Sequence, residues 1–598
     1  MNKREMLDQE WINATATRNF ANSNCLLDWL DLYGKSKGFK RDQDYEDYDE
    51  RTDFSLFVMR KGLEFENTVA GHLSTLIPMK TVLETGEYGF DPRGYDKTMN
   101  AMNLGEPLIY QAVLRDEDSR TYGIADFLIR SDKLFEFFPG SISEEESATG
   151  ASNLGEQDWH YRVIDSKFTT LNFLASGILS TSGSTWGHML QIYIYNRALG
   201  MMQGYTPPGG YLLGRKWEQT IKGEKQRGNV CTDSLGYVSS DAFSKSKGLV
   251  SQSVDQACDW IRKVKEEGAT WDAIPEPSVP ELRPNMGSKS DQPWSHAKKE
   301  INQELRDLTT LWQVGVDKRN AANAAGIYRW DEGEYSPEDV GVKGAKTAPT
   351  LQKIIDINRS TSDQAVLPLK VSVSDQSWRE ERSLEFFVDF ETVSDLDDDF
   401  SKIPCSGGQP LIFMIGCGHL ENGEWNWASF TTDDLTEASE AEIIDQWIDH
   451  MAKTELRLGR LGEDPYVFHW SHAEQTTFDT AFNSAKSRHP EKGWIQPNWY
   501  DFLKTVVKEE PLVIRGSFGF GLKSVAGSLH SLGLIDTSWD SGPTDGLGAM
   551  VGAWSGASEA SGKGISMKDV EMIKEISRYN EVDCKVMMEV IIYLRRQH

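Results

Sequence analysis

Val163-Ile164-Asp165-Ser166-Lys167 is the stretch of the chain on which the fold prediction depends. Its apolar start predicts a buried strand, and side chains two residues apart on a strand emerge on the same side. The strand therefore presents a carboxylate and an ammonium group together. A carboxylate can hold a divalent cation, and a lysine can orient water or neutralise charge on a phosphate, which favours a metal-dependent hydrolase. A salt bridge at a strand end produces the same pattern, so the rest of the chain has to decide.

Length and composition indicate a multidomain protein. At 598 residues the chain exceeds what one hydrophobic core normally supports, so we expect two to four domains. The sequence has no apolar leader after Met1 and no run of about 18 apolar residues, which predicts a soluble, intracellular protein with no membrane contact. Its six cysteines contain no Cys-x-x-Cys pair, which argues against a disulfide framework or a zinc ribbon.

The formal net charge of -29 opposes the approach of this chain to a polyanion. Any activity on nucleic acid must therefore depend on bound cations and local basic patches. Such patches can act because the Debye length at physiological salt is only about 8 Å, so a groove can differ in sign from the whole protein.

Two helices are expected near the start of the chain, over residues 10–35 and 53–76. The second helix carries another candidate carboxylate. Glu66 falls on the same helical turn as Val69 and Ala70, which suits a carboxylate at the border of a buried face. A solvated glutamate on an amphipathic helix is the alternative.

A second carboxylate is embedded in an expected strand. Strands are expected over 108–114 and 122–129, and Asp126 has apolar neighbours on both sides in the latter. An unpaired carboxylate there is costly, so a cation or a hydrogen-bond donor must lie nearby. Residues 140–157 read as a long acidic surface loop before the strand over 160–168. In a helix that begins near Thr185, Gln191 and Tyr195 are four residues apart and share a face.

The ordered set of these motifs resembles the PD-(D/E)xK nucleases of the RecB type. The shared elements are Glu66 four residues after Gly62, Gly123-Ile124-Ala125-Asp126, Asp165-Ser166-Lys167 and Gln191-x-x-x-Tyr195. The resemblance implies that Glu66, Asp126 and Asp165 ligate Mg²⁺ or Mn²⁺, with help from the Ile164 carbonyl. It also implies that Lys167 assists the attacking water, and that Gln191 and Tyr195 position the helix, the lysine or the DNA backbone.

The sequence departs from this family in two respects. Many relatives carry His where Glu66 stands, and the gap of 39 residues from Asp126 to Asp165 is long, which the acidic loop explains. Relatives with an iron–sulfur cluster carry cysteines before the first motif and a cysteine triplet after the Gln-Tyr helix. Cys25 lies near the first of these positions, but no triplet follows, so no iron–sulfur cluster is expected.

A basic segment follows the Gln-Tyr helix and is the best candidate for phosphate contact in an acidic protein. Between 215 and 227, five basic residues stand against two acidic ones. The basic residues are Arg215, Lys216, Lys222, Lys225 and Arg227. A solvated hairpin explains the segment equally well.

A helix over 251–267 and a proline-rich stretch over 275–284 close the first domain. Two short helices, over 305–312 and 319–327, are then expected to join through Gly315. This resembles a helix-hairpin-helix unit, which holds a nucleic-acid backbone through the amides of its turn. A purely structural connector is the alternative.

A second acidic constellation is expected near the C-terminal end. The run from Leu384 to Thr392 predicts a strand with Asp389 and Glu391 on one face, and two carboxylates crowded there repel unless a cation lies between them. Far downstream, Tyr579 and Asp583 are four residues apart on one face of a helix.

Paired acids on a first strand and Tyr-x-x-x-Asp on a last helix resemble the DEDD-type exonucleases of the ribonuclease H-like fold. The family's further acidic residue would be Glu474, with Asp501 as the competing candidate unless it caps a helix. The resemblance implies that Asp389, Glu391, Glu474 and Asp583 bind two Mg²⁺ or Mn²⁺ ions. It implies that Tyr579 orients the water and that Lys523, at the end of Gly516–Lys523, touches phosphate.

The sequence therefore predicts an α/β protein in three parts. These are a restriction-endonuclease-like, RecB-type nuclease domain over 1–285, a helical connector over 286–375, and a ribonuclease H-like domain with a mixed sheet over 376–598. The order resembles that of the RecB-family predicted nucleases of bacteria and large DNA viruses, which implies a cytoplasmic location, or the host cytoplasm or nucleus for a viral protein.

We expect a Mg²⁺- or Mn²⁺-dependent nuclease, specifically an exonuclease on single-stranded or end-bearing DNA in repair, recombination or genome processing, with replication or repair proteins as candidate partners. The alternative is a catalytically decayed nucleic-acid-binding or scaffold protein. A carbohydrate or small-nucleotide hydrolase is disfavoured, because the sequence has no phosphate loop or sugar-binding aromatic pattern.

Overall fold

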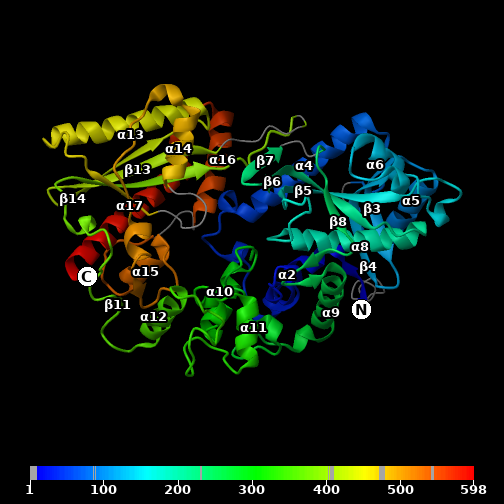
Figure 1. Ribbon diagram of the computed structural model, residues 1–598, viewed down its shortest axis with the longest axis horizontal. Helices are drawn as coiled ribbons and strands as arrows, with labels where there is room; N and C mark the ends of the chain where they lie inside the picture. Colours follow the sequence, from blue (N-terminus) through cyan, green and yellow to red (C-terminus); the bar gives the residue numbers. More distant parts are fainter. Residues whose placement is uncertain are drawn as a thin grey trace. The chain divides into compact units, whose positions relative to one another are not determined.

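The computed structural model describes residues 10–84, 87, 89–228, 232–401, 403, 410–470, 478–539 and 545–598. The chain is an α/β protein, as the sequence predicts, and it divides into two units that each contain a mixed sheet (Figure 1). Unit 1 is formed by the described residues of Met1–Tyr48, Ser55–Leu305 and Asp398–Gly407, and unit 2 by those of Asp49–Phe54, Arg306–Asp397 and Gly408–His598. Within the described ranges, no helix has the length and apolar character needed to cross a membrane.

The sheet of unit 1 is built around β5 (Tyr161–Phe173), which contains the Asp165-Ser166-Lys167 motif. β5 pairs antiparallel with β4 (Thr121–Arg130) and parallel with β6 (Gly209–Ile221). The path continues through β3 (Leu108–Asp116) to β2 (Met79–Thr81) on one side and to β7 (Glu224–Gly228) on the other, while β1 (Ile12–Asn13) pairs with β4 and β8 (Gly236–Ser239) with β6. A two-stranded sheet of β9 (Phe243–Ser244) and β10 (Gly248–Leu249) lies outside this path.

Helices cover both faces of this sheet, and this explains the apolar run in β5. On one face α4 (Phe54–Leu76) shares a core with Ile164, and on the other α8 (Thr185–Gln203) and α9 (Val250–Glu267) share a core with Val163. Both strand residues have no exposed surface. A strand buried on both faces needs consecutive apolar residues, not alternating ones. The other helices of unit 1 are α2 (Arg18–Ala21), α3 (Leu26–Trp29), α5 (Pro92–Asn103), α6 (Ser131–Phe137), α7 (Glu144–Ser147) and α10 (Ser295–Leu305).

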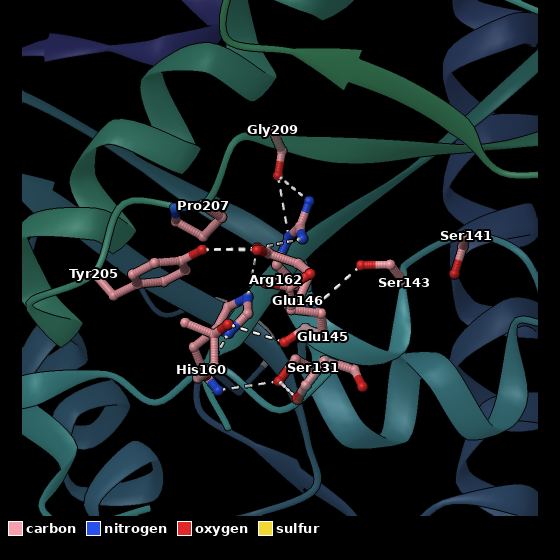
Figure 2. A network of polar contacts seen from close by, with 12 residues as sticks. Ser131, Ser141, Ser143, Glu145, Glu146, His160, Arg162, Tyr205, Pro207 and Gly209 are labelled. Atoms are coloured by element: carbon pink, nitrogen blue, oxygen red, sulfur yellow. Dashed lines mark hydrogen bonds and ion pairs between the residues drawn. The ribbon is translucent and has the colours of Figure 1, made fainter. Parts of the chain in front are cut away.

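The acidic segment between β4 and β5 is largely exposed, as expected, but it is not merely a loop. It contains α7, and Figure 2 shows Glu146 of that helix at the centre of a polar network. Glu146 accepts a hydrogen bond from the Tyr205 hydroxyl at 2.9 Å and lies 3.3 Å from the guanidinium of buried Arg162. Arg162 also donates to the Gly209 carbonyl at 2.7 Å. This network fixes the segment to the start of β5, so the long gap between Asp126 and Asp165 does not loosen the strand.

Unit 2 contains a five-stranded sheet in the order β14-β13-β12-β15-β16. Its central strand β12 (Glu385–Val393) pairs antiparallel with β13 (Leu411–Glu421) and parallel with β15 (Tyr466–His469). The edge strands are β14 (Glu424–Thr431) and β16 (Trp499–Asp501), and a separate pair joins β11 (Val366–Leu367) to β17 (Val513–Ile514). The helices of this unit are α11 (Val316–Ala324), α12 (Thr347–Arg359), α13 (Glu437–Arg457), α14 (Phe478–Arg488), α15 (Leu522–Ser531), α16 (Gly546–Lys563) and α17 (Glu571–Gln597).

The two faces of β12 pack against different helices. Phe386, Val388 and Phe390 share a core with α13, whereas Phe387 belongs to the core that contains α17. Figure 1 shows α13 and α17 on opposite sides of this sheet. Because strand side chains alternate, Asp389 has the same parity as Phe387 and points to the α17 side.

Several elements match the sequence prediction. The helices expected over 53–76, from 185 and over 251–267 are α4, α8 and α9, and the strands expected over 108–114, 122–129 and 160–168 are β3, β4 and β5.

Two predicted helices differ in the structure. The segment 10–35 is helical only in its second half, where α3 continues as a π-helical stretch over Leu30–Gly34, while its first half is broken into β1, a 3₁₀ turn and α2. Ser23 separates the halves at φ 55°, between two asparagines whose side chains compete with helical hydrogen bonds. The helix predicted over 305–312 is a single 3₁₀ turn at Leu308–Thr310, because the buried Asp307 carboxylate accepts from the Thr309 amide at 2.9 Å and caps that turn instead. The connector segment itself divides, with α10 in unit 1 and α11 in unit 2.

Candidate metal centres

The first candidate site is centred on β5 in unit 1. Asp165 and Lys167 emerge on the same side of the strand and form a direct ion pair between Asp165 Oδ2 and Lys167 Nζ. Asp165 has no exposed surface, and its other oxygen, Oδ1, is buried without a hydrogen-bond partner in the described part of the chain. A buried carboxylate oxygen without a donor is costly, and it is the kind of atom that a cation can satisfy.

Asp126 of β4 is held against the same strand. Its Oδ2 accepts hydrogen bonds from the Ser166 amide at 2.7 Å and from the Ser166 hydroxyl at 2.6 Å. The donor that the apolar surroundings of Asp126 require is therefore the middle residue of the Asp165-Ser166-Lys167 motif. The two motifs are joined directly by these bonds.

Glu66 reaches the site from α4, where Val69 and Ala70 are buried beneath it as predicted. Glu66 itself is half-buried. Its Oε1 accepts from the Tyr110 hydroxyl at 2.8 Å and also from the Gln111 side-chain amide. Glu66 is thus not a solvated glutamate, and two residues of β3 fix its orientation.

The charges of this site influence one another. Burial, followed by the Asp126 charge, raises the pKa of Glu66 to about 7. Burial also raises the pKa of Asp165 to about 7, although the Lys167 charge opposes this shift. Burial would lower the pKa of Lys167, but the carboxylates of Asp165, Asp126 and Glu66 outweigh it and raise that pKa. Lys167 therefore stays protonated and is the internal cation among three acids.

The Gln191-Tyr195 pair of α8 packs behind the strand residues. Gln191 Nε2 donates to the Tyr195 hydroxyl at 2.8 Å, and both side chains are buried. A Cβ added at Gly123 would lie 2.3 Å from the Tyr195 ring, so glycine at 123 is what lets α8 approach β4 this closely. Two of the predicted motifs therefore meet at this contact, which positions α8 on the sheet.

The second candidate site is in unit 2. Asp389 and Glu391 of β12 and Asp583 of α17 each offer a carboxylate oxygen, and these atoms lie within 4.8 Å of one another. In the described ranges this is the only group of three or more Asp, Glu, His or Cys side chains with such geometry. Glu391 and Asp583 are 6% and 8% exposed, while Asp389 is half-buried.

The acids of this second site strongly oppose one another's ionisation. Burial, together with the Asp583 and Glu391 charges, raises the pKa of Asp389 well above its ordinary range. Burial and the Asp583 charge raise the pKa of Glu391 to about 8. Burial raises the pKa of Asp583 to about 7, against the opposing charge of Lys523. Such mutual repulsion is typical of carboxylates arranged around a cation position.

Tyr579 and Lys523 lie beside this triad, as the sequence predicts for a shared site. Lys523 Nζ is 4.5 Å from the centre of the Tyr579 ring. Burial and the charges of Asp583, Glu391 and Asp389 raise the pKa of the Tyr579 hydroxyl, so it remains a hydrogen-bond donor at any physiological pH.

Sequence reasoning missed two residues of the second site. Asn580 donates from Nδ2 to Asp389 Oδ2 at 3.0 Å, and Trp539 donates from Nε1 to Asp583 Oδ1 at 3.0 Å. Asn580 fits only because residue 416 of β13 is glycine, since a Cβ there would lie 1.8 Å from Asn580 Oδ1. Asn580 could have been found from the sequence, because it lies between Tyr579 and Asp583 in the motif. Trp539 lies in no motif, so the sequence carried no signal for it.

The fourth acid of the second site stays a prediction. Glu474 lies outside the described residues. The competing candidate, Asp501, is at the end of β16, and its Oδ1 accepts from the Lys504 amide at 3.0 Å. This contact is a capping contact, which is the alternative role expected for Asp501 from the sequence.

The basic segment is a hairpin of β6 and β7, with Lys222 and Gly223 at positive φ in the turn. Lys222, Lys225 and Arg227 are exposed and Lys216 is half-buried, and Lys225 is paired with Glu218 at 2.7 Å. Arg215 differs from the others, because it is buried and its guanidinium binds the Asp398 carboxylate, with Nη2 and Oδ1 at 2.9 Å. The structure thus places four of the five basic residues where solvent reaches them and gives Arg215 an internal partner.

Comparison with protein-family models, with curated proteins and with solved structures finds no match to this chain.

Proposed function

We propose that this chain is a divalent-metal-dependent nuclease with one site in each unit. The observation that carries the proposal is the group of Asp389, Glu391 and Asp583, three crowded and mostly buried carboxylates with ligand atoms within 4.8 Å of one another. Burying like charges this closely opposes folding unless a cation offsets them. The donor atoms are all carboxylate oxygens, which suit Mg²⁺ or Mn²⁺ better than the softer metals that prefer Cys or His.

The first site supports the same proposal through different residues. Asp165 keeps a buried oxygen without a donor, and Asp126 and Glu66 are close enough to alter the pKa values around it. The order of Glu66, Asp126, Asp165 and Lys167 is the order that resembles the RecB-type PD-(D/E)xK nucleases. In unit 2, paired acids on the first strand of the five-stranded sheet and Tyr579 and Asp583 on the last helix agree with the resemblance to DEDD-type exonucleases of the ribonuclease H-like fold.

A bound Mg²⁺ or Mn²⁺ would supply Lewis acidity and an activated water at each site. The chain's own residues account for the rest. Lys167, which stays charged beside Asp165, can stabilise negative charge that develops on a phosphate. Tyr579 keeps its proton and donates a hydrogen bond to Asp583, so its hydroxyl oxygen can orient a water by accepting from it. In unit 1 the exposed hairpin residues Lys222 and Arg227 offer a positive surface for a phosphate backbone.

We propose DNA with single-stranded regions or ends as the substrate, and exonucleolytic cleavage, by resemblance to the two families. The alternative is a scaffold in which the sites no longer act. The net charge of -29 favours it, because that charge slows approach to any nucleic acid.

A cleavage assay separates these functions. Labelled single-stranded DNA, double-stranded DNA and RNA are incubated with Mg²⁺, Mn²⁺ or EDTA, using the wild type, Lys167→Ala and Asp389→Asn. Lys133→Ala and Asp449→Asn are matched controls, because the half-buried Lys133 and the exposed Asp449 form ordinary surface ion pairs with Glu136 and Lys453. We expect metal-dependent cleavage that each site variant reduces in part and that the controls retain. Lys167→Ala and Asp389→Asn combined in one chain should reduce it by two orders of magnitude or more, about the loss seen when one charge-stabilising group is removed from a site. Cleavage that neither variant reduces would reject the two proposed sites, and no cleavage by the wild type on any substrate would favour the scaffold.

A further inference from the structure

Gln111 has an unusual backbone conformation for a residue within a strand. It is the fourth residue of β3, yet its φ is +56°, in the left-handed region that side chains other than glycine, asparagine and aspartate rarely adopt. Other left-handed residues of the chain, such as Arg120, lie between strands where a turn requires the conformation. No turn is present at Gln111, because the β3–β4 pairing continues on both sides of it.

At this point the side chains of β3 and β4 switch from one side of the sheet to the other. Tyr110 is paired with Phe127, and both pack against the core beneath α4. Two residues later Ala112 is paired with Ala125, and both belong to the core beneath α8. In a regular strand, residues two apart share a face, so the alternation is interrupted here. The position opposite Gln111 in this register is Asp126, so the interruption coincides with a proposed metal ligand.

The interruption brings the Gln111 side chain into contact with Glu66, another proposed metal ligand. The Gln111 amide donates to Glu66 Oε1, the same oxygen that accepts from the Tyr110 hydroxyl. Both donors thus converge on one oxygen of Glu66 and leave Oε2 for another ligand. Irregular strand positions next to active sites commonly redirect a side chain in this way.

We propose that Gln111, together with Tyr110, is a positioning residue of the first metal site: its left-handed conformation directs its amide to Glu66, which holds Oε2 toward the cation position beside Asp126 and Asp165. This inference rests on the proposed function of that site. It differs from a purely structural role, because the change of face needs only the left-handed backbone, which glycine also adopts, whereas the contact with Glu66 needs the Gln111 amide.

The decisive variant is Gln111→Gly, made in an Asp389→Ala background so that only the first site acts. Glycine adopts the same φ without strain but lacks the amide. We expect an unchanged or higher melting temperature, together with an affinity for Mn²⁺, measured by calorimetric titration, and a cleavage rate that are each lower by about 10- to 100-fold, the usual effect of losing a residue that orients a metal ligand. Tyr110→Phe, which removes the other donor, should act in the same direction.

Arg120→Gly is the matched control, since it relieves a similar φ of 51° in the β3–β4 turn. It should leave Mn²⁺ affinity and cleavage unchanged. Unchanged Mn²⁺ affinity in Gln111→Gly would overturn the inference, and so would a large fall in melting temperature, which would show a structural role. If the background protein binds Mn²⁺ through Asp165 but does not cleave, the proposed function fails while the titration still decides the role of Gln111. If no Mn²⁺ binding depends on Asp165, both are rejected.

Discussion

Asp583→Asn should change the stability of unit 2 in a way that depends on pH. Burial raises the pKa of Asp583 from 3.8 to about 7 in the folded protein. Between these two values the folded protein binds more protons than the unfolded chain, so without metal the stability falls as pH rises through this window. Asparagine has the shape of the protonated acid and can still accept the hydrogen bond from Trp539, but it cannot ionise.

The size of the effect follows from the shift. Each tenfold change in proton affinity corresponds to about 1.4 kcal/mol, so Asp583 costs the folded state up to about 4 kcal/mol above pH 7. The cost is an upper value, because Asp389 and Glu391 can take up the proton instead. At about 2–4 °C per kcal/mol, Asp583→Asn should melt up to about 8–16 °C above the wild type at alkaline pH.

Thermal unfolding in EDTA at about pH 5 and about pH 8.5 tests this prediction. By the lower pH only about the first third of the window from 3.8 to about 7 has been crossed, so the variant should melt above the wild type by about a third of its alkaline gain. Asp449→Asn on the exposed face of α13 is the control, and its effect should be small at both pH values. Equal melting shifts for Asp583→Asn at the two pH values would refute the argument that these carboxylates are crowded in a poorly solvated site.

Three further substitutions test the packing around the sites, each measured by denaturant unfolding. Asp398→Asn leaves the buried Arg215 guanidinium without its anionic partner and should destabilise unit 1 by about 3–5 kcal/mol; a change below about 1 kcal/mol would show that the pair is solvated. Gly416→Ala places a Cβ 1.8 Å from Asn580 Oδ1, so it should cost about 1–3 kcal/mol and weaken metal binding in unit 2, and unaltered binding would contradict the role of Asn580. In Gly71→Ala of α4 the added Cβ meets no atom within 4 Å, so this variant should instead stabilise the protein by about 0.5–1 kcal/mol. No gain in stability would show that residue 71 lies in a buried environment.

The parts of the sites that could be predicted are those set by local periodicity. Asp165 and Lys167 are two residues apart on a strand, and Asp389 and Glu391 likewise, so strand geometry alone places each pair on one side. The helical spacing of Gln191 and Tyr195 predicts their contact in the same way, and the structure has it at 2.8 Å.

The remaining contacts could not be predicted because they depend on tertiary structure. Arg215 is the clearest case: a count of charges along the segment marks it as a surface cation, yet its partner Asp398 is 183 residues away in sequence and draws it into the core of unit 1. Gln111 could not be identified from the sequence, because a left-handed glutamine within an apolar strand has no signature in residue type. Trp539 is likewise linked to Asp583 only through the fold.

The two candidate sites balance their negative charge differently, and this has a consequence for metal binding. In unit 1 Lys167 is paired directly with Asp165, so part of the acidic charge is neutralised by the chain itself. The pKa values of Glu66 and Asp165 there rise to about 7. In unit 2, despite the charge of Lys523, the pKa of Glu391 rises to about 8 and that of Asp389 well above its ordinary range. A dication should therefore relieve more repulsion in unit 2 than in unit 1. Saturation to 100 times the dissociation constant adds about 2.7 kcal/mol to whichever unit binds the ion. At alkaline pH, limiting Mg²⁺ should thus protect the amides of α17 from hydrogen exchange before those of β5, and the reverse order would show that Lys167 does not offset the charge of Asp165.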